Sequence, residues 1–250
     1  MNKKILLVAG DPLSINTEII FKAWKSLSKK IKKNVILIGN FNLINKQFKV
    51  LKYKIPTVKL NDLGDKNYYN KLKIIDVPLK FTNPFKIPLK TSSEYIIKSL
   101  TLAHNLAVRQ DIQGFANCPI DKIHLKKTKK VGVTEFLASK CKVPKNSEVM
   151  LIHNKNFSVV PLTTHIRIKN VAKTLNQKFI KNKVLSLNKN FKKLFKEKPK
   201  IGILGLNPHN SELQKKLEEK QVLIPVIRYL KDNKVNISGP LVSDTLFIED

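Results

Sequence analysis

The stretch KKILLVAGDPLSINTEIIFKAWKSLSKKIKKNVILIGN, residues 3–40, decides the fold class of this chain. It opens with an apolar run that breaks at a Gly-Asp-Pro turn, and it closes with a second apolar run at residues 34–40. Between the runs, residues 14–30 carry apolar side chains at steps of four from Ile19 to Leu27, as one face of a helix requires. A strand, a helix and a second strand in this order are typical of an α/β fold.

Strand-like and helix-like segments keep alternating over the rest of the chain. The clearest helix is predicted over residues 92–110, where Ile96, Leu100 and Ala107 fall on one face. The other predicted segments are strands at 71–78, 114–119 and 200–206, a hairpin from 148–154 and 157–165, and helices at 166–180, 188–198 and 211–232, the last broken near Pro225. This alternation predicts mixed, largely parallel sheets covered by helices, with some antiparallel pairing.

The net charge of +30 comes almost entirely from lysine, because only three of the 48 basic residues are arginines. The guanidinium fork of arginine suits base reading and phosphate binding better than an ammonium group does. The lysines are also spread along the whole chain rather than gathered in one segment. We therefore expect no specific nucleic-acid partner, and only weak, salt-sensitive binding without sequence preference stays open.

Cysteine content and hydropathy point to a cytoplasmic protein. Cys118 and Cys141 are the only cysteines and lack the C-x-x-C spacing of metal and redox sites, so we expect free, buried thiols in a reducing compartment. No stretch approaches the roughly 18 uninterrupted apolar residues of a membrane span, so we expect no membrane partner.

Four polar clusters follow predicted strands, at the carboxyl ends where ligands bind in open α/β sheets. They are Gly10-Asp11-Pro12, residues 117–122, Thr163-Thr164-His165 and Asn207-Pro208-His209. His165 and His209 are candidate metal ligands, since neutral imidazole is a common ligand of zinc and similar ions. A catalytic site needs about three protein ligands, so spacing alone leaves a metal site and an ordinary pair of polar residues both open.

The remaining histidines are weaker site candidates, and the absence of several loop motifs disfavours two classes of enzyme. His104 lies in a predicted helix, His124 in a lysine-rich loop and His153 beside a hairpin turn, so we expect structural or solvated roles for all of them. The chain contains no Walker loop, no G-x-G-x-x-G and no G-x-S-x-G, which disfavours a P-loop NTPase and an α/β-hydrolase.

Six segments, in the same order along the chain, resemble the 4-hydroxythreonine-4-phosphate dehydrogenase family of vitamin B6 biosynthesis. They are AGDPLSINTEI, NCPIDK, GVTEFLA, TTHIRIKNV, GLNPH and GPLVSDTLF. The GLNPH segment is identical to the family's own, and the other five each differ from the family pattern at some positions. One short segment of this kind is weak support, whereas six in register make the chain similar to this family over its whole length.

The resemblance implies a fold like that of the isocitrate and isopropylmalate dehydrogenases. Residues 1–250 would form one family domain made of two α/β lobes, incomplete at its C-terminal end, within a homodimer. The implied reaction is the NAD-dependent oxidation of the 3-hydroxyl of 4-phosphooxy-L-threonine, assisted by a divalent metal ion such as zinc, magnesium or cobalt. The resulting β-keto acid loses CO2 to give 3-amino-2-oxopropyl phosphate, on the route to pyridoxal phosphate.

The resemblance also implies roles for individual residues. His165 and His209 match two metal histidines of the family, and Thr134 matches its substrate-contacting threonine. Asp244 is the aspartate of the Asp-Thr-Leu-Phe segment, and as a catalytic residue it would orient the substrate or a metal-bound group. Lys122 is expected near anionic groups of the substrate, with a solvated lysine as the alternative. Contacts to NAD are expected outside this chain and are not assigned.

Two departures from the family pattern keep other interpretations open. Val133 stands where the family has a substrate-contacting histidine, which admits a sister dehydrogenase for another phosphorylated hydroxy acid, such as threonate or erythronate 4-phosphate. The chain also stops at Asp250, before the segment in which the resemblance places a third metal histidine and much of the phosphate-binding set. An inactive, truncated relative is therefore a third interpretation, because two imidazoles alone would hold a catalytic metal weakly.

Overall fold

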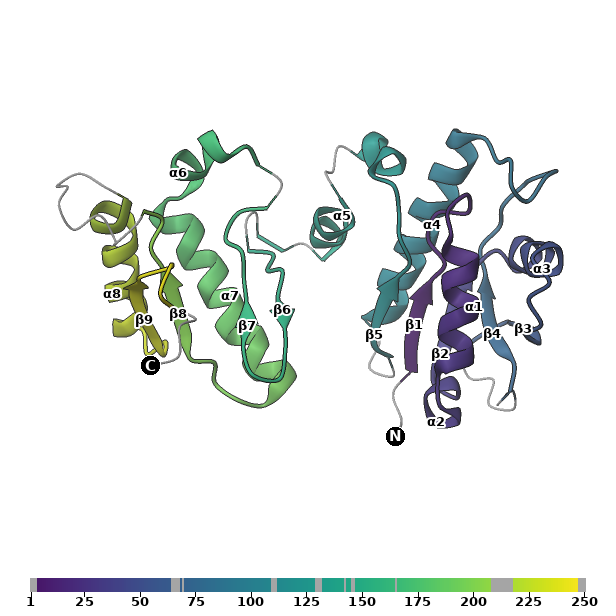
Figure 1. Cartoon of the computed structure of the whole chain (residues 1–250), viewed down its shortest axis with the longest axis horizontal. Coiled ribbons are helices and arrows are strands. Elements are labelled where there is room, and N and C mark those ends of the chain that lie inside the picture. Colours follow the sequence, from purple (N-terminus) through teal and green to yellow (C-terminus); the bar gives the residue numbers. More distant parts are fainter. Residues whose placement is uncertain are drawn as a thin grey trace. The chain divides into compact units, whose positions relative to one another are not determined.

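The computed structural model describes residues 4–63, 68, 70–108, 112–128, 132–141, 143–144, 147–164, 166–207 and 218–246. The chain divides into two compact units, Met1–Cys141 and Lys142–Asp250, each with a hydrophobic core of its own (Figure 1). We call these ranges unit 1 and unit 2.

Unit 1 is built on a five-stranded sheet in which every described pairing is parallel. The strand order is β3-β4-β2-β1-β5, so the first strand lies between the second and the fifth. The strands are β1 (Lys4–Val8), β2 (Val35–Gly39), β3 (Thr57–Leu60), β4 (Leu72–Asp76) and β5 (Ile112–Asn117). Because the strands are parallel, their carboxyl ends share one edge of the sheet, and the loops after β1 and β5 are neighbours.

Helices cover both faces of this sheet (Figure 1). They are α1 (Asn16–Ser26), α2 (Lys29–Lys32), α3 (Phe41–Val50), α4 (Leu89–Ala107), the 3-10 helix η1 (Lys122–Thr128) and α5 (Val133–Lys140). Leu6 and Ile36 pack with α4 on one face, whereas Leu37 and Ile74 pack with α1 and α3 on the other. This division follows from the strand period of two, which directs alternate side chains to opposite faces.

Unit 2 has a smaller core, in which two helices pack on a pair of parallel strands. The helices are α7 (Gln177–Phe195) and α8 (Ile224–Asp232), and the strands are β8 (Ile201–Leu204) and β9 (Ile237–Leu241). The other described elements are a hairpin of β6 (Ile152–His153) and β7 (Ser158–Val159), the 3-10 helix η2 (Ile168–Asn170), the helix α6 (Val171–Thr174) and the π-helix η4 (Glu219–Leu223), which runs directly into α8. The predicted α/β class with largely parallel sheets is confirmed.

The prediction of one continuous helix over residues 14–30 is wrong. The structure divides it into α1 and α2, with an extended residue at Leu27 between them. The hydroxyl of Ser28 accepts the backbone N–H of Ile31 at 3.4 Å and caps α2. A serine that bonds to the backbone at a helix start competes with a continuous helix, and this competition explains the break.

The two helices predicted at residues 166–180 and 188–198 are also wrong in their bounds. Most of both ranges belongs to the single helix α7, which is preceded by η2 and α6. Asn176 begins α7 by accepting the backbone N–H of Phe179 at 2.9 Å through its side-chain oxygen. The first range therefore crosses a helix start that the apolar spacing alone does not reveal.

Five elements, α3, β3, η1, α5 and β9, were not predicted, and the predicted hairpin is shorter than expected. Helix α3 begins after Asn40, whose side-chain oxygen accepts the N–H of Leu43 at 2.8 Å. The hairpin strands β6 and β7 have two residues each. Residues 211–217 of the last predicted helix lie outside the described residues, and the remainder changes from π-helix to α-helix at Ile224, next to Pro225.

The two cysteines differ in their surroundings. Both are free thiols, and Cys118 is buried as predicted, but the prediction is wrong for Cys141, which is exposed at the end of α5. Burial raises the pKa of Cys118 to about 11, so it stays a protonated thiol at neutral pH. Among the described residues, no helix is both long and apolar enough to cross a membrane.

Leu100→Ala should lower the free energy of unfolding of unit 1 by about 2–5 kcal/mol, because Leu100 is fully buried between α4 and the sheet. Leu89→Ala in the same helix is the matched control, since half of that side chain is exposed, and should cost less than about 1 kcal/mol. Urea unfolding followed by the fluorescence of Trp24, the only tryptophan, measures both. Equal losses in the two variants would contradict the assigned core.

Candidate functional site

At the carboxyl edge of the unit 1 sheet, the loop after β1 is bonded to the loop after β5. The backbone N–H of Asp11 donates to the carbonyl of Pro119 at 3.2 Å. The side-chain amide of Asn16 donates to the carbonyls of both Pro119, at 2.8 Å, and Asp11, at 3.1 Å. Gly10 has a φ of 74°, and a Cβ there would lie 2.6 Å from the Asn16 amide nitrogen, so the close approach of the loops requires glycine.

A buried histidine adds a second connection between the same two loops. Nε2 of His124, in η1, lies 3.0 Å from the carboxylate of Asp11, and its Nδ1 lies 3.1 Å from the hydroxyl of Ser93 in α4. Only 4% of the His124 side chain is exposed. The other carboxylate oxygen of Asp11 accepts the N–H of Leu13 at 3.0 Å. One imidazole therefore joins the β1 loop, η1 and the first turn of α4.

The predicted substrate residues of unit 1 lie close to this contact in the chain. Lys122 is the first residue of η1, two positions before His124, and its side chain is exposed. Thr134 is exposed in the first turn of α5, a helix that packs against η1. Both side chains can therefore reach a solvent-borne ligand, and no hydrogen bond joins the two within the described part of the chain.

In unit 2, the loop that follows β8 is held by a buried carboxylate. Oε1 of Glu219 accepts the backbone N–H groups of Leu206 and Asn207, both at 2.8 Å. Its Oε2 accepts the side-chain amide of Asn207 at 3.0 Å. Burial acts to raise the pKa of Glu219, but the hydrogen bonds from Asn207 and Leu206 together outweigh it, and the net effect is a lowered pKa. Glu219 is thus held as an anion in the core of unit 2.

The other predicted site residues are described only in part. His165 and His209, the predicted metal ligands, lie outside the described residues. Asp244 is exposed in the turn that follows β9. Within the described ranges, no group of three or more histidine, cysteine, aspartate or glutamate side chains is arranged to hold a metal ion.

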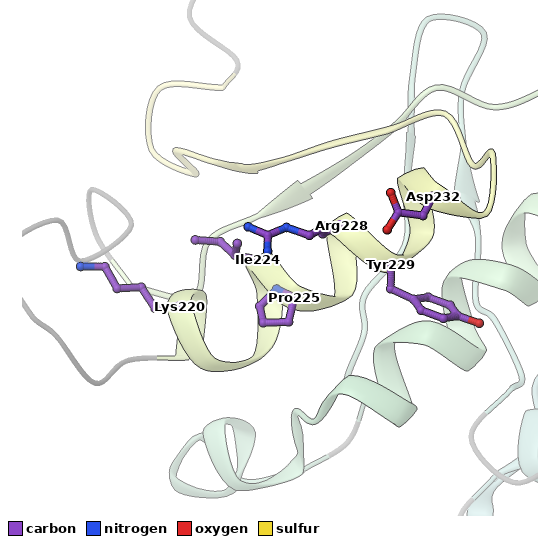
Figure 2. A pocket seen from close by; sticks show the side chains of 6 residues that line it. All are labelled: Lys220, Ile224, Pro225, Arg228, Tyr229 and Asp232. Carbon is purple, nitrogen blue, oxygen red and sulfur yellow. The ribbon is translucent and has the colours of Figure 1, made fainter.

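Unit 2 also has a surface groove, lined by other residues. It has a volume of about 400 Å³, and its six lining side chains come from η4 and α8 (Figure 2). Arg228, Tyr229 and Asp232 are among them. None of the predicted site residues that the structure describes lines it, so we do not assign the site to this groove.

Residues 31–250 match the family described as "Pyridoxal phosphate biosynthetic protein PdxA". The chain belongs to this family. Among its relatives, the 4-hydroxythreonine-4-phosphate dehydrogenase of Aquifex aeolicus is 32% identical over 255 residues, which cover 99% of this chain and 77% of that protein. The protein of the same name from Sulfurihydrogenibium is 28% identical over 252 residues, which cover 98% of this chain and 76% of the relative.

Solved structures named 4-hydroxythreonine-4-phosphate dehydrogenase have the same fold. The 4-hydroxythreonine-4-phosphate dehydrogenase of Klebsiella pneumoniae matches with a TM-score of 0.86 at 23% identity, covering 99% of this chain and 77% of that one. The protein of the same name from Burkholderia phymatum matches with a TM-score of 0.78 at 24% identity, and the match covers 98% of this chain and 76% of that one. These similarities confirm the predicted fold class.

Two residues that organise the strand-end loops could not be found from local sequence patterns. His124 has a structural role, as expected, but its partner Asp11 is 113 positions away in the chain. Glu219 lies 12 positions beyond Asn207, and the only local signal is an acidic pair within a lysine-rich segment. Both residues act through contacts that only the folded chain creates.

His124→Ala should lower the free energy of unfolding of unit 1 by about 1–3 kcal/mol, because it removes the buried contacts of the imidazole with one carboxylate oxygen of Asp11 and with the Ser93 hydroxyl. His104→Ala in α4 is the control. Its imidazole makes only a 3.7 Å contact with the Cys141 sulfur, so a smaller loss is expected. Urea unfolding followed by Trp24 fluorescence measures both, and a loss in His124→Ala no larger than in the control would contradict the structural role.

The side-chain amide of Asn207 should report the protonation of Glu219. A lowered folded-state pKa means that ionised Glu219 stabilises unit 2 above about pH 4.3, and that this contribution disappears as the pH falls through the folded-state value. NMR signals of the Asn207 amide should therefore titrate with a midpoint below about 4.3. Glu218→Gln should keep this midpoint and Glu219→Gln should abolish it, whereas a midpoint above 4.3 would show that burial dominates.

Proposed function

We propose that this chain belongs to an NAD-dependent dehydrogenase that, with a divalent metal ion, oxidises and decarboxylates 4-phosphooxy-L-threonine. The product would be 3-amino-2-oxopropyl phosphate, in the biosynthesis of pyridoxal phosphate. The observation that carries the proposal is the match of residues 31–250 to the PdxA family. Relatives named 4-hydroxythreonine-4-phosphate dehydrogenase, similar over 98–99% of the chain, support it.

The residues present fit a divalent metal ion by their donor chemistry. His165 and His209 would hold the ion through neutral imidazole nitrogens, which suit zinc, cobalt and, less strongly, magnesium. Glu219 holds Leu206 and Asn207, which precede His209 in the sequence. Further ligands would come from the substrate, from water or from residues other than those the structure describes. When bound, such an ion lowers the pKa of the alcohol to be oxidised and stabilises the negative charge left by loss of CO2.

The remaining site residues would bind and orient the substrate. Thr134 would donate a hydrogen bond to it, and Lys122 would pair with its anionic groups, since both side chains are exposed at the edge of unit 1. Asp244 would orient the substrate from the turn after β9. NAD, when bound, would accept the hydride that C3 of the substrate loses as its hydroxyl gives up a proton. The β-keto acid would then release CO2, and a proton would be added to the carbon that carried the carboxylate.

The environment of Val133 favours a second candidate substrate. Val133 begins α5, and its side chain packs against the hydrophobic core of unit 1. It therefore offers no polar group where the family has a substrate-contacting histidine. A sister dehydrogenase acting on threonate or erythronate 4-phosphate would need a different set of polar contacts, and this substitution is consistent with such a change.

We also propose the assembly and the location of the protein. The two units would form one domain with two lobes, and two copies would form a homodimer in the cytoplasm. The PdxA family resemblance supports this assembly. Sedimentation equilibrium tests it, because a monomer at micromolar concentration would contradict the proposed dimer.

The full-length gene product should reduce NAD in the presence of 4-phosphooxy-L-threonine and a divalent metal. His209→Ala and His165→Ala should each lower kcat/KM on the order of 100-fold or more, as expected when a group that stabilises charge in the transition state is lost. His153→Ala is the control, because His153 lies exposed in the β6–β7 hairpin. NADH absorbance with a panel of phosphorylated hydroxy acids measures the rates.

Two results would contradict parts of this proposal. Preference for threonate or erythronate 4-phosphate over 4-phosphooxy-L-threonine would favour the sister dehydrogenase. A folded protein that turns over none of these substrates with zinc, cobalt or magnesium would favour an inactive relative.

A further inference from the structure

We propose that His124 is the positioning residue for Lys122, and that its contact with Asp11 holds the turn from which the Lys122 ammonium binds an anionic group of the substrate. The inference rests on the proposed function, because it takes Lys122 to be a substrate-binding residue. It adds a buried residue of unit 1 that touches no substrate and that acts through the backbone of the segment between β5 and η1.

Residues 119–124 form a short segment whose two ends are both bonded to Asp11. At its start, the carbonyl of Pro119 accepts the backbone N–H of Asp11 at 3.2 Å. At its end, Nε2 of His124 lies 3.0 Å from the Asp11 carboxylate. One residue of the β1 loop therefore fixes both where the segment begins and where it ends, and Lys122 lies between these two points.

The Pro119 end of the segment is held by two further features. The side-chain amide of Asn16, a residue that is 2% exposed, donates to the Pro119 carbonyl at 2.8 Å. A Cβ at Gly10 would lie only 2.7 Å from the same carbonyl oxygen, so the two loops approach each other more closely than a side chain there allows. The start of the segment is therefore packed directly against the β1 loop.

The His124 end of the segment is buried and bonded on both sides of the imidazole. The hydroxyl of Ser93 donates to the carbonyl of Leu89 at 2.7 Å, so its oxygen is left to accept an N–H from Nδ1 of His124 at 3.1 Å. Leu125, the next residue, is fully buried in the core of unit 1. Because buried polar groups are costly to leave without partners, the imidazole resists displacement from Asp11 and Ser93.

The chain between the two ends is closed into a turn that carries Lys122. The carboxylate of Asp121 accepts the N–H of Ile123 at 2.9 Å, and its carbonyl accepts the N–H of His124 at 3.1 Å. Lys122 is exposed at this turn, and its ammonium makes no hydrogen bond or ion pair with the part of the chain that the structure describes. A fixed backbone with a solvated cation beyond the carboxyl end of β5 suits the binding of an anionic ligand.

Lys126 provides a matched comparison in the same 3-10 helix. It is exposed like Lys122, but it follows His124 and Leu125 and so lies outside the segment that Asp11 holds. Replacement of either lysine by methionine removes one positive charge from η1 and keeps a long, unbranched side chain. Only the change at 122 removes a charge from the turn that His124 positions.

The experiment measures the binding of 4-phosphooxy-L-threonine to the full-length gene product by calorimetry, without NAD. Lys122→Met should weaken binding about 10–100-fold, as for loss of a hydrogen bond between charged groups, whereas Lys126→Met should stay within about twofold of wild type. His124→Phe keeps a ring in the buried site but removes both nitrogen contacts. We expect it to weaken binding about 3–30-fold.

A double-mutant cycle separates positioning from a general loss of structure. Added to Lys122→Met, His124→Phe should change the Kd by less than about twofold, because the group that it positions is already gone. Added to Lys126→Met, it should keep its full effect. In turnover, His124→Phe should raise KM and leave kcat within about threefold of wild type, since binding and not the reaction step is affected.

Two further variants of the experiment make it decisive. Should His124→Phe fail to fold, Asn16→Ala replaces it in the cycle, because it loosens the Pro119 end of the same segment. The substrate without its phosphate, 4-hydroxy-L-threonine, identifies the anionic group. If Lys122→Met binds this compound as wild type does, Lys122 contacts the phosphate, and if its binding is weakened as much as that of the substrate, Lys122 contacts the carboxylate.

The results that would overturn the inference differ from those that would overturn the proposed function. Wild-type affinity in Lys122→Met or in His124→Phe would show that the turn does not serve substrate binding. Fully additive effects of the two changes would show that His124 acts through other residues. Binding without turnover in the wild-type protein would contradict the proposed reaction alone, because the binding cycle still decides the role of His124. A wild-type protein that binds no substrate would overturn both.

Discussion

The parallel pairing of β1 with both β2 and β5 is the constraint on which unit 1 depends. It brings the loops after residues 8 and 117 to the same edge of the sheet, although more than a hundred positions separate them in the chain. Once these loops are neighbours, their backbone groups need partners, and short polar side chains supply them. The contact of Asn16 with Pro119 and the absence of a side chain at Gly10 both follow from this proximity.

In both units a carboxylate group accepts backbone N–H groups of a loop at a strand end. In unit 1, Asp11 accepts the N–H of Leu13 and faces the imidazole of His124. In unit 2, Glu219 accepts two backbone N–H groups of the loop after β8. A loop at a strand end has unpaired N–H groups, and an anion accepts them more strongly than a neutral oxygen does. Asp11 lies inside the first of the six family segments, whereas Glu219 lies outside all of them.

The sequence predicts elements better than their boundaries, for physical reasons. Buried parallel strands need unbroken apolar runs, so β1 and β2 were evident. Strand β9, ISGPL, was not, because Gly239 and Pro240 are typical of turns. Asn40 is the last residue of one predicted strand and also caps α3. Because the same residue serves both elements, the start of the helix was not recognised in the sequence. The candidate site residues came from local segments, whereas His124 and Glu219 act through partners 113 and 12 positions away, which no local pattern encodes.

In a chain so rich in lysine, the positions of the few acidic residues show where the fold needs hydrogen-bond acceptors. The chain has 18 acidic residues against 48 basic ones, yet Asp11, Asp76 and Glu219 all bond to loops at strand ends. Asp76, the last residue of β4, accepts the N–H of Phe41 at 2.8 Å and so anchors the start of α3. Lysine has three donors and no acceptor, so it could not replace an acid that receives backbone N–H groups. The acids at these strand ends therefore mark positions where the fold requires acceptors.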